Sequence, residues 1–144
     1  MNEEKTFETM LNESEVQPKE ELINAPHPWT DWKVGGNVYK LKLTNGIIKM
    51  LERSFKKSLL LAVIDDGVPP VSVMVDVVQG AMQKYHHGMN SAKVEALFDA
   101  YIDEGHTVYD LLAEVIYPLL TDAGFFTKAM LEEMQTQLKA SMTM

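Results

Sequence analysis

The chain has 144 residues, a length that fits one domain and leaves little room for two. Hydrophobic residues make up 46% of it and no segment is of low complexity, which favours a folded globular protein. The absence of cysteine excludes disulfides, cysteine-bound zinc and thiol catalysis, and the formal net charge of −8 argues against general binding to nucleic-acid backbones.

The charge is unevenly distributed along the chain. Residues 37–57 carry a net charge of +5, whereas the segments before and after them carry −5 and −8. We interpret the basic segment as a solvated face or a contact for an acidic partner, in preference to an RNA or lipid patch. The N-terminus is acidic where a secretory signal is basic, and the longest aliphatic run, residues 59–64, is far shorter than the roughly 20 residues that span a bilayer. We therefore expect a soluble, cytoplasmic protein without a membrane partner.

Residues 1–36 form a distinct N-terminal segment. They are acidic, contain three prolines and few aliphatic residues, and predict a partly flexible arm with a turn or two of helix around Phe7, Met10 and Leu11. Trp29 and Trp32, near the end of this arm, are too apolar to stay in water, so we expect them to pack on the domain or on a partner. Residues 37–144 are expected to form the folded helical domain.

The domain begins with a short strand. Residues 37–43 alternate, so that Tyr39, Leu41 and Leu43 share one side and Val38, Lys40 and Lys42 share the other. A lone strand needs a partner, and residues 29–34 are the candidate. The sequence therefore predicts a small hairpin that turns at Gly35-Gly36.

Helical segments follow in sequence. Thr44 or Asn45 can cap the first, residues 58–64 form a second short one, and Pro69-Pro70 suit the first turn of a third. The third carries apolar residues as far as Tyr85, and Gly88 suits its stop.

Three further helices complete the domain. Asn90 or Ser91 caps one that Gly105 stops, Thr107 caps another, and the last begins at about Thr127. Pro118 should kink or end the helix that contains it. Each helix has one apolar stripe that must be buried against another helix. The predicted fold class is mainly α, a compact bundle of about five helices with a small N-terminal β-strand or hairpin element.

Candidate chemical sites give no catalytic or metal centre. Adjacent His86 and His87 diverge by about 100° on a helix, so we interpret them as residues at a helix C-terminus, where imidazole meets the helix dipole favourably. Asp99 and Asp103, with Glu104 beside them, lack the glycine-punctuated loop of a calcium site and are interpreted as a solvated face. Because neither a nucleophile elbow nor a phosphate-binding loop is present, we predict no enzyme activity, no cofactor and no metal.

Methionine is abundant, with ten residues, and its flexible side chain suits adaptable contacts between proteins. Met74 and Met82 are expected to fill the core. For the methionines near the C-terminus, core filling and partner contact both remain open, and we name Met130 and Met134 as candidate partner-binding residues. Phe125 and Phe126 join them as candidates, although packing of the last helix on the bundle is the interpretation we favour for this pair.

The order of segments resembles a known family, over about residues 37–126. The segments that carry the resemblance are Leu41-Lys42-Leu43-Thr44, Leu51-Glu52, the block 83–88 (Gln-Lys-Tyr-His-His-Gly), the block 98–105 (Phe-Asp-x-Tyr-Ile-Asp-Glu-Gly), and Ala123-Gly124-Phe125-Phe126. The chain is similar in these segments to the tail assembly chaperones of long-tailed phages and prophages of Gram-positive bacteria. The blocks 83–88 and 98–105 are the most specific, and neither is a catalytic motif. The acidic arm at 1–36 departs from the shorter start expected of that family.

The resemblance implies a function in the host bacterial cytoplasm. The protein would bind the tape measure protein, a long and aggregation-prone helical chain, keep it soluble until the tail tube forms around it, and be absent from the mature virion. The major tail tube protein is a second candidate partner, and self-association stays open. The alternatives are a permanent structural component of the tail and a small acidic inhibitor or adaptor.

Overall fold

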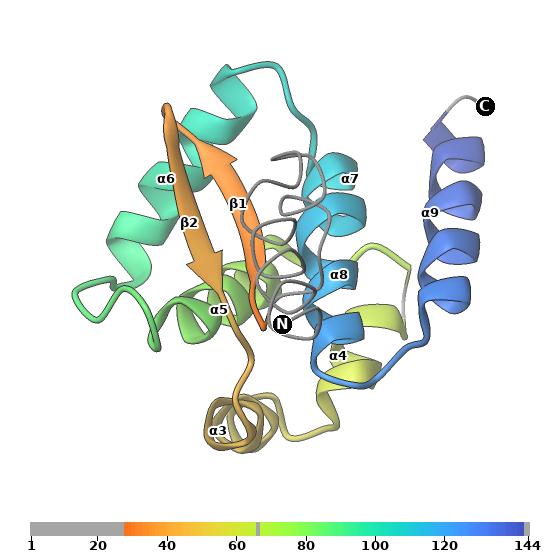
Figure 1. Cartoon of the computed structure of the whole chain (residues 1–144), viewed down its shortest axis with the longest axis horizontal. Helices are drawn as coiled ribbons and strands as arrows, with labels where there is room; N and C mark the ends of the chain where they lie inside the picture. The colour runs from red at the N-terminus through yellow and green to blue at the C-terminus, as the bar shows by residue number, and fades with distance from the viewer. Residues whose placement is uncertain (1–27, 66, 143–144) are drawn as a thin grey trace, which may run out of the picture.

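The computed structural model of the chain describes residues 28–65 and 67–142. Within them, helices surround a two-stranded antiparallel hairpin, and the last helix stands at the outer edge (Figure 1). The predicted fold class, mainly α with a small N-terminal β element, is confirmed. The helical turns predicted around Phe7, Met10 and Leu11 lie outside the described residues.

The predicted hairpin is present. Strand β1 (Thr30–Val34) pairs with β2 (Asn37–Leu41), with Trp32 opposite Tyr39. The turn falls at Gly35-Gly36, where both residues have positive φ, a conformation that costs glycine little. Trp32 and Val34 are almost completely buried. The folded unit therefore begins before the predicted division between residues 36 and 37, because β1 supplies part of the core.

Three hydrogen bonds fasten the hairpin to the helices. The Thr30 hydroxyl donates to the Asp122 carboxylate at 2.6 Å, and the Gly35 amide donates to the Glu104 carboxylate. The Lys42 amide, just beyond β2, donates to the Ala81 carbonyl at 2.8 Å. These bonds tie the two ends of the hairpin to different helices, so the hairpin holds those helices together.

Of the predicted caps, Thr44, Asn90 and Thr107 begin their helices, and Ser58, for which no cap was predicted, begins another. Thr44, Ser58, Asn90 and Thr107 each accept a hydrogen bond from a backbone amide three residues later, which satisfies a donor that the first turn leaves free. The first four helices after the hairpin are α3 (Asn45–Phe55), α4 (Leu59–Ile64), α5 (Val71–Met82) and α6 (Ser91–Asp103).

Helix α5 ends earlier than predicted. It was expected to reach Tyr85 and stop near Gly88, but its last residue is Met82. The side chain of Gln83 donates to the Gln79 carbonyl at 3.1 Å and to the Met89 carbonyl at 3.5 Å. This side chain bridges the helix end and the following turn, so α5 ends six residues before Gly88, the expected stop.

The central rod continues through Pro118. Helix α7 (Val108–Leu111), the π-helical segment η1 (Leu112–Ile116) and α8 (Tyr117–Asp122) follow without a break, and Figure 1 shows α7 and α8 as one column. Pro118 was expected to kink or end the helix; a π turn directly before it lets the helix continue.

The core lies between the hairpin, α5 and this rod. Trp32 is 1% exposed, and its ring meets those of Phe98 and Tyr101 edge-on at 5.6 and 5.8 Å between centroids. Met74 and Met82 are buried, which confirms their predicted role in the core. Helices α3 and α5 approach closely at Gly80, where an added Cβ would lie 2.8 Å from the Ile47 Cγ2 atom.

Candidate partner-binding site

The last helix, α9 (Lys128–Met142), is the least buried long helix among the described residues. It has 15 residues, and none of its described side chains is fully buried, whereas α5 buries seven of its 12 residues. Leu131, Met134 and Leu138 are half-buried and pack against the core from positions i, i+3 and i+7. A single stripe, one side chain wide, therefore holds α9 to the protein.

A wide groove runs along one flank of α9. Its volume is about 440 Å³, and α4, α8 and the turn before α9 form its far side. The apolar residues that line it are Ile64, Tyr117, Phe126, Met130, Met134 and Leu138. Ile64 and Met130 are 36% and 46% exposed, so the groove presents apolar surface to solvent at both of its walls.

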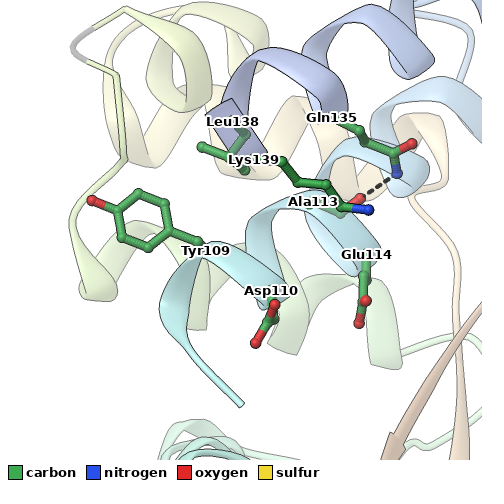
Figure 2. Close-up of a pocket in the computed structure, with 7 residues that line it drawn as sticks. All are labelled: Tyr109, Asp110, Ala113, Glu114, Gln135, Leu138 and Lys139. Atoms are coloured by element: carbon green, nitrogen blue, oxygen red, sulfur yellow. Dashed lines mark hydrogen bonds between the residues drawn. The ribbon is translucent and has the colours of Figure 1, made fainter. Parts of the chain in front are cut away.

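A smaller cleft of about 210 Å³ lies on the opposite flank of α9 (Figure 2). Tyr109, Asp110 and Glu114 line it from the central rod, and Leu138 and Lys139 line it from α9. Since the helix has open space on both flanks, few contacts resist its separation from the rod. Low contact density of this kind marks the parts of a protein that open most easily.

One hydrogen bond links α9 to the backbone of the rod. The Gln135 side-chain amide donates to the Ala113 carbonyl at 2.7 Å, drawn as a dashed line in Figure 2. Ala113 lies in η1, where the Tyr117 amide donates five residues back to the Leu112 carbonyl. The next amide position belongs to Pro118, which has no N–H. The π turn and the proline thus deprive the Ala113 carbonyl of an intrahelical donor, and Gln135 supplies one from outside.

The structure places the four predicted partner-binding residues together around the start of α9. Phe126 is buried at 9% exposed, and Phe125 is half-buried against the core. Met130 is exposed, and Met134 is half-buried in the wall of the wide groove. All four remain predictions as partner contacts. Of the other C-terminal methionines, Met144 and the side chain of Met142 lie outside the described part of the chain.

Sequence reasoning missed the other walls of this site. Ile64 and Tyr117 belong to segments that were assigned only to helix packing, and Gln135 sits among the polar residues of an exposed helix. Pro118 was the one signal available, because a proline inside a helix leaves a carbonyl without its donor. Which residue supplies the replacement donor depends on where α9 lies, and no local pattern contains that information.

The predicted role of the histidine pair is wrong for His86. Because α5 ends at Met82, His86 lies beyond the helix, where its Nε2 atom accepts a hydrogen bond from the Lys40 amide at 3.0 Å. It therefore caps the outer edge of β2, and its ring meets Tyr39 edge-on at 5.4 Å. Among residues 28–65 and 67–142, no group of three or more His, Asp and Glu side chains is placed to hold a metal ion. Asp99, Asp103 and Glu104 are exposed.

The contact of His86 with β2 predicts a loss of stability in acid. Burial, and then the charge of Lys40, lower the pKa of His86 below 6.5. As the pH falls below about 6.5 the unfolded chain takes up this proton more readily than the folded one, so the free energy of unfolding decreases until the folded-state pKa is passed. Urea unfolding at pH 7.5 and 5.0 should show a smaller loss for His86→Gln than for wild type. His87→Gln, which keeps His86, should retain the wild-type loss; equal losses in all three proteins would contradict the assignment.

Comparison with known proteins identifies the family and nothing more specific. The chain belongs to a family of unknown function (DUF6096), whose match covers residues 30–143. The match starts at the first residue of β1, so it spans both the hairpin and the helices. Neither the curated proteins nor the solved structures contain a match. No helix in the described ranges is long and apolar enough to cross a membrane.

Proposed function

We propose that the protein is a phage tail assembly chaperone that binds the tape measure protein through the wide groove beside α9. The observation that carries the proposal is the groove itself, which exposes apolar side chains between α9 and the side formed by α4 and α8. A tape measure chain is long and largely helical, and its amphipathic segments would place their apolar faces in such a groove. The resemblance in the blocks 83–88 and 98–105 supports the same function.

The chemistry of the groove suits a client with many similar segments. Met130 and Met134 are flexible and adapt to apolar surfaces of different shape, so successive helices of one long chain can use the same groove. The net charge of −8 favours solubility of the complex, because like-charged complexes repel one another. Reversible binding of this type fits a protein that leaves when tail tube subunits take over.

The test is co-expression with the tape measure protein of the same phage, followed by mass spectrometry of purified virions. We expect the tape measure protein to stay soluble and to co-purify with this chain, and the chain to be absent from virions. Its presence in virions in stoichiometric amount would instead support a structural tail component. A tape measure protein that is equally soluble without this chain would contradict the proposal.

A matched pair of variants locates the binding surface. Ile64 lines the groove from α4 and is 36% exposed, whereas Ile102 is 45% exposed on α6, on the far side of the molecule from α9 (Figure 1). Aspartate would place an unpaired charge against the apolar face of the client, so Ile64→Asp should weaken tape measure binding at least about tenfold. Ile102→Asp should leave the co-purified amount unchanged, and the reverse pattern would place the site on α6.

A further inference from the structure

We infer that α9 occupies, in the free protein, the surface on which a helix of the partner binds in its place. The partner helix would carry apolar residues at positions i, i+3 and i+7, a hydrogen-bond donor at i+4 and a cation at i+8. This inference rests on the proposed function for the identity of the partner. It goes further in naming the partner's side-chain pattern and in making the departure of α9 part of binding.

The apolar part of the pattern comes from α9 itself. Leu131, Met134 and Leu138 are the side chains that α9 packs against the core, and their spacing puts them on one helical face. The surface beneath includes Tyr117 and Phe126, which line the wide groove. A surface that already accepts one amphipathic helix accepts another of the same pattern.

The requirement for a donor at i+4 follows from the π turn, which leaves the Ala113 carbonyl without an intrahelical partner. Without Gln135, the Ala113 carbonyl would lose its donor from α9. With α9 in place Ala113 is 9% exposed, and a helix that replaced α9 would cover it in the same way. Leaving a buried acceptor unpaired is unfavourable, so any helix that replaces α9 is selected for a donor at this position. Glutamine, asparagine, arginine and lysine side chains provide one. The carbonyl therefore fixes the register in which a partner helix binds.

The requirement for a cation at i+8 follows from the acidic side chains of the smaller cleft. Asp110 and Glu114 line it from the central rod, and Lys139 is the residue of α9 that lines it with them (Figure 2). Because opposite charges attract and like charges repel, a partner helix with lysine or arginine here is favoured and one with an acidic residue is disfavoured.

Displacement gives α9 a role in release. The tethered helix competes with the partner at a high effective concentration, so it lowers the affinity for any single segment and closes the surface when the partner leaves. On this account the client meets Met130 and Met134 at the wide groove before α9 leaves, and Tyr117 and Phe126 afterwards.

The direct test uses a fluorescent peptide of residues 127–142 as the probe and the full chain as the receptor. The chain variant Gln135→Ala weakens the tethered helix, so it should bind the peptide at least tenfold more tightly than wild type in an anisotropy titration. The matched variant Gln137→Ala, in the same helix but two residues further on, should bind like wild type. A peptide that itself carries Gln135→Ala should bind at least tenfold more weakly. Equal affinities across these combinations would overturn the inference.

A crosslink provides a second test, which does not depend on weakening α9. The chain has no cysteine, so Glu114→Cys with Lys139→Cys introduces one pair across the smaller cleft, open to a short thiol crosslinker. Without crosslinker the double variant should still bind the peptide, more weakly because it lacks the Glu114 charge, and the crosslinked chain should lose the remaining binding. Undiminished binding to the crosslinked chain would show that α9 need not leave. Because the probe is a peptide of this chain, failure to bind the tape measure protein would contradict the proposed function and leave this result standing.

Discussion

Trp32→Ala should lower the free energy of unfolding by about 3–5 kcal/mol, the usual cost of truncating a large buried aromatic residue. Trp32 is 1% exposed and lies in β1, with the rings of Tyr39, Phe98 and Tyr101 around it. Its removal would leave a cavity between the hairpin and α6. Since β1 belongs to the segment predicted as an arm, the result also tests whether residues before 37 stabilise the domain. Urea unfolding followed by circular dichroism measures it.

Two matched variants show which property of Trp32 matters. Trp29 is only half-buried; its ring meets Tyr85 edge-on and lies beneath the Lys40 ammonium, so Trp29→Ala should cost much less. Trp32→Phe keeps an aromatic ring and removes the indole Nε1 atom, a buried donor without a partner among the described residues. It should therefore cost clearly less than Trp32→Ala. Equal costs for Trp29→Ala and Trp32→Ala would contradict this account of the core.

Gly80→Leu should destabilise the protein by about 1–3 kcal/mol through overpacking. Gly80 is fully buried in α5, and an added Cβ would lie 2.8 Å from the Ile47 Cγ2 atom and 3.5 Å from the Leu51 Cδ1 atom. The Ile47 methyl is attached directly to its Cβ, so it moves only if the whole side chain rotates. The larger side chain would therefore push α3 away from α5. Thermal unfolding of the variant measures the loss.

Gly46→Ala is the control for Gly80, because both glycines lie in helices. An added Cβ at Gly46 meets nothing within 4 Å, so only the backbone effect remains. Replacing a helical glycine by alanine stabilises by roughly 0.5–1 kcal/mol, and Gly46→Ala should raise the melting temperature by a few degrees. An unchanged melting temperature for Gly80→Leu would contradict the close contact of α3 with α5, and a drop for Gly46→Ala would contradict the open space around Gly46.

Most of the fold was predictable because its signals are local. The caps at Thr44, Asn90 and Thr107 follow from side chains that accept hydrogen bonds three residues ahead, and they begin helices where expected. The hairpin turn needs positive φ at Gly35 and Gly36, and two consecutive glycines in a sequence indicate such a turn. Helix ends were harder: α5 stops at Met82 because the Gln83 side chain bonds to two different backbone carbonyls, one of them beyond the turn.

The site was predictable only in part. Aromatic and methionine side chains near the C-terminus marked Phe125, Phe126, Met130 and Met134, and the structure brings them together around the start of α9. Their exposure differs from 9% at Phe126 to 46% at Met130, and no periodicity distinguishes the two. His86 was assigned to a helix end that lies four residues earlier, because its partner, the Lys40 amide, comes from a strand 46 positions away.

The class of fold, the start of each helix, and the hairpin with its turn follow from the sequence alone. Each of these depends on contacts within a few positions. The three-dimensional arrangement adds what depends on distant neighbours. It leaves α9 sparsely buried, opens a groove on each flank of it, and pairs Gln135 with a carbonyl 22 residues away that a proline had deprived of its donor. Such pairings depend on packing and on hydrogen-bond satisfaction across the whole molecule, and no short stretch of sequence contains that information.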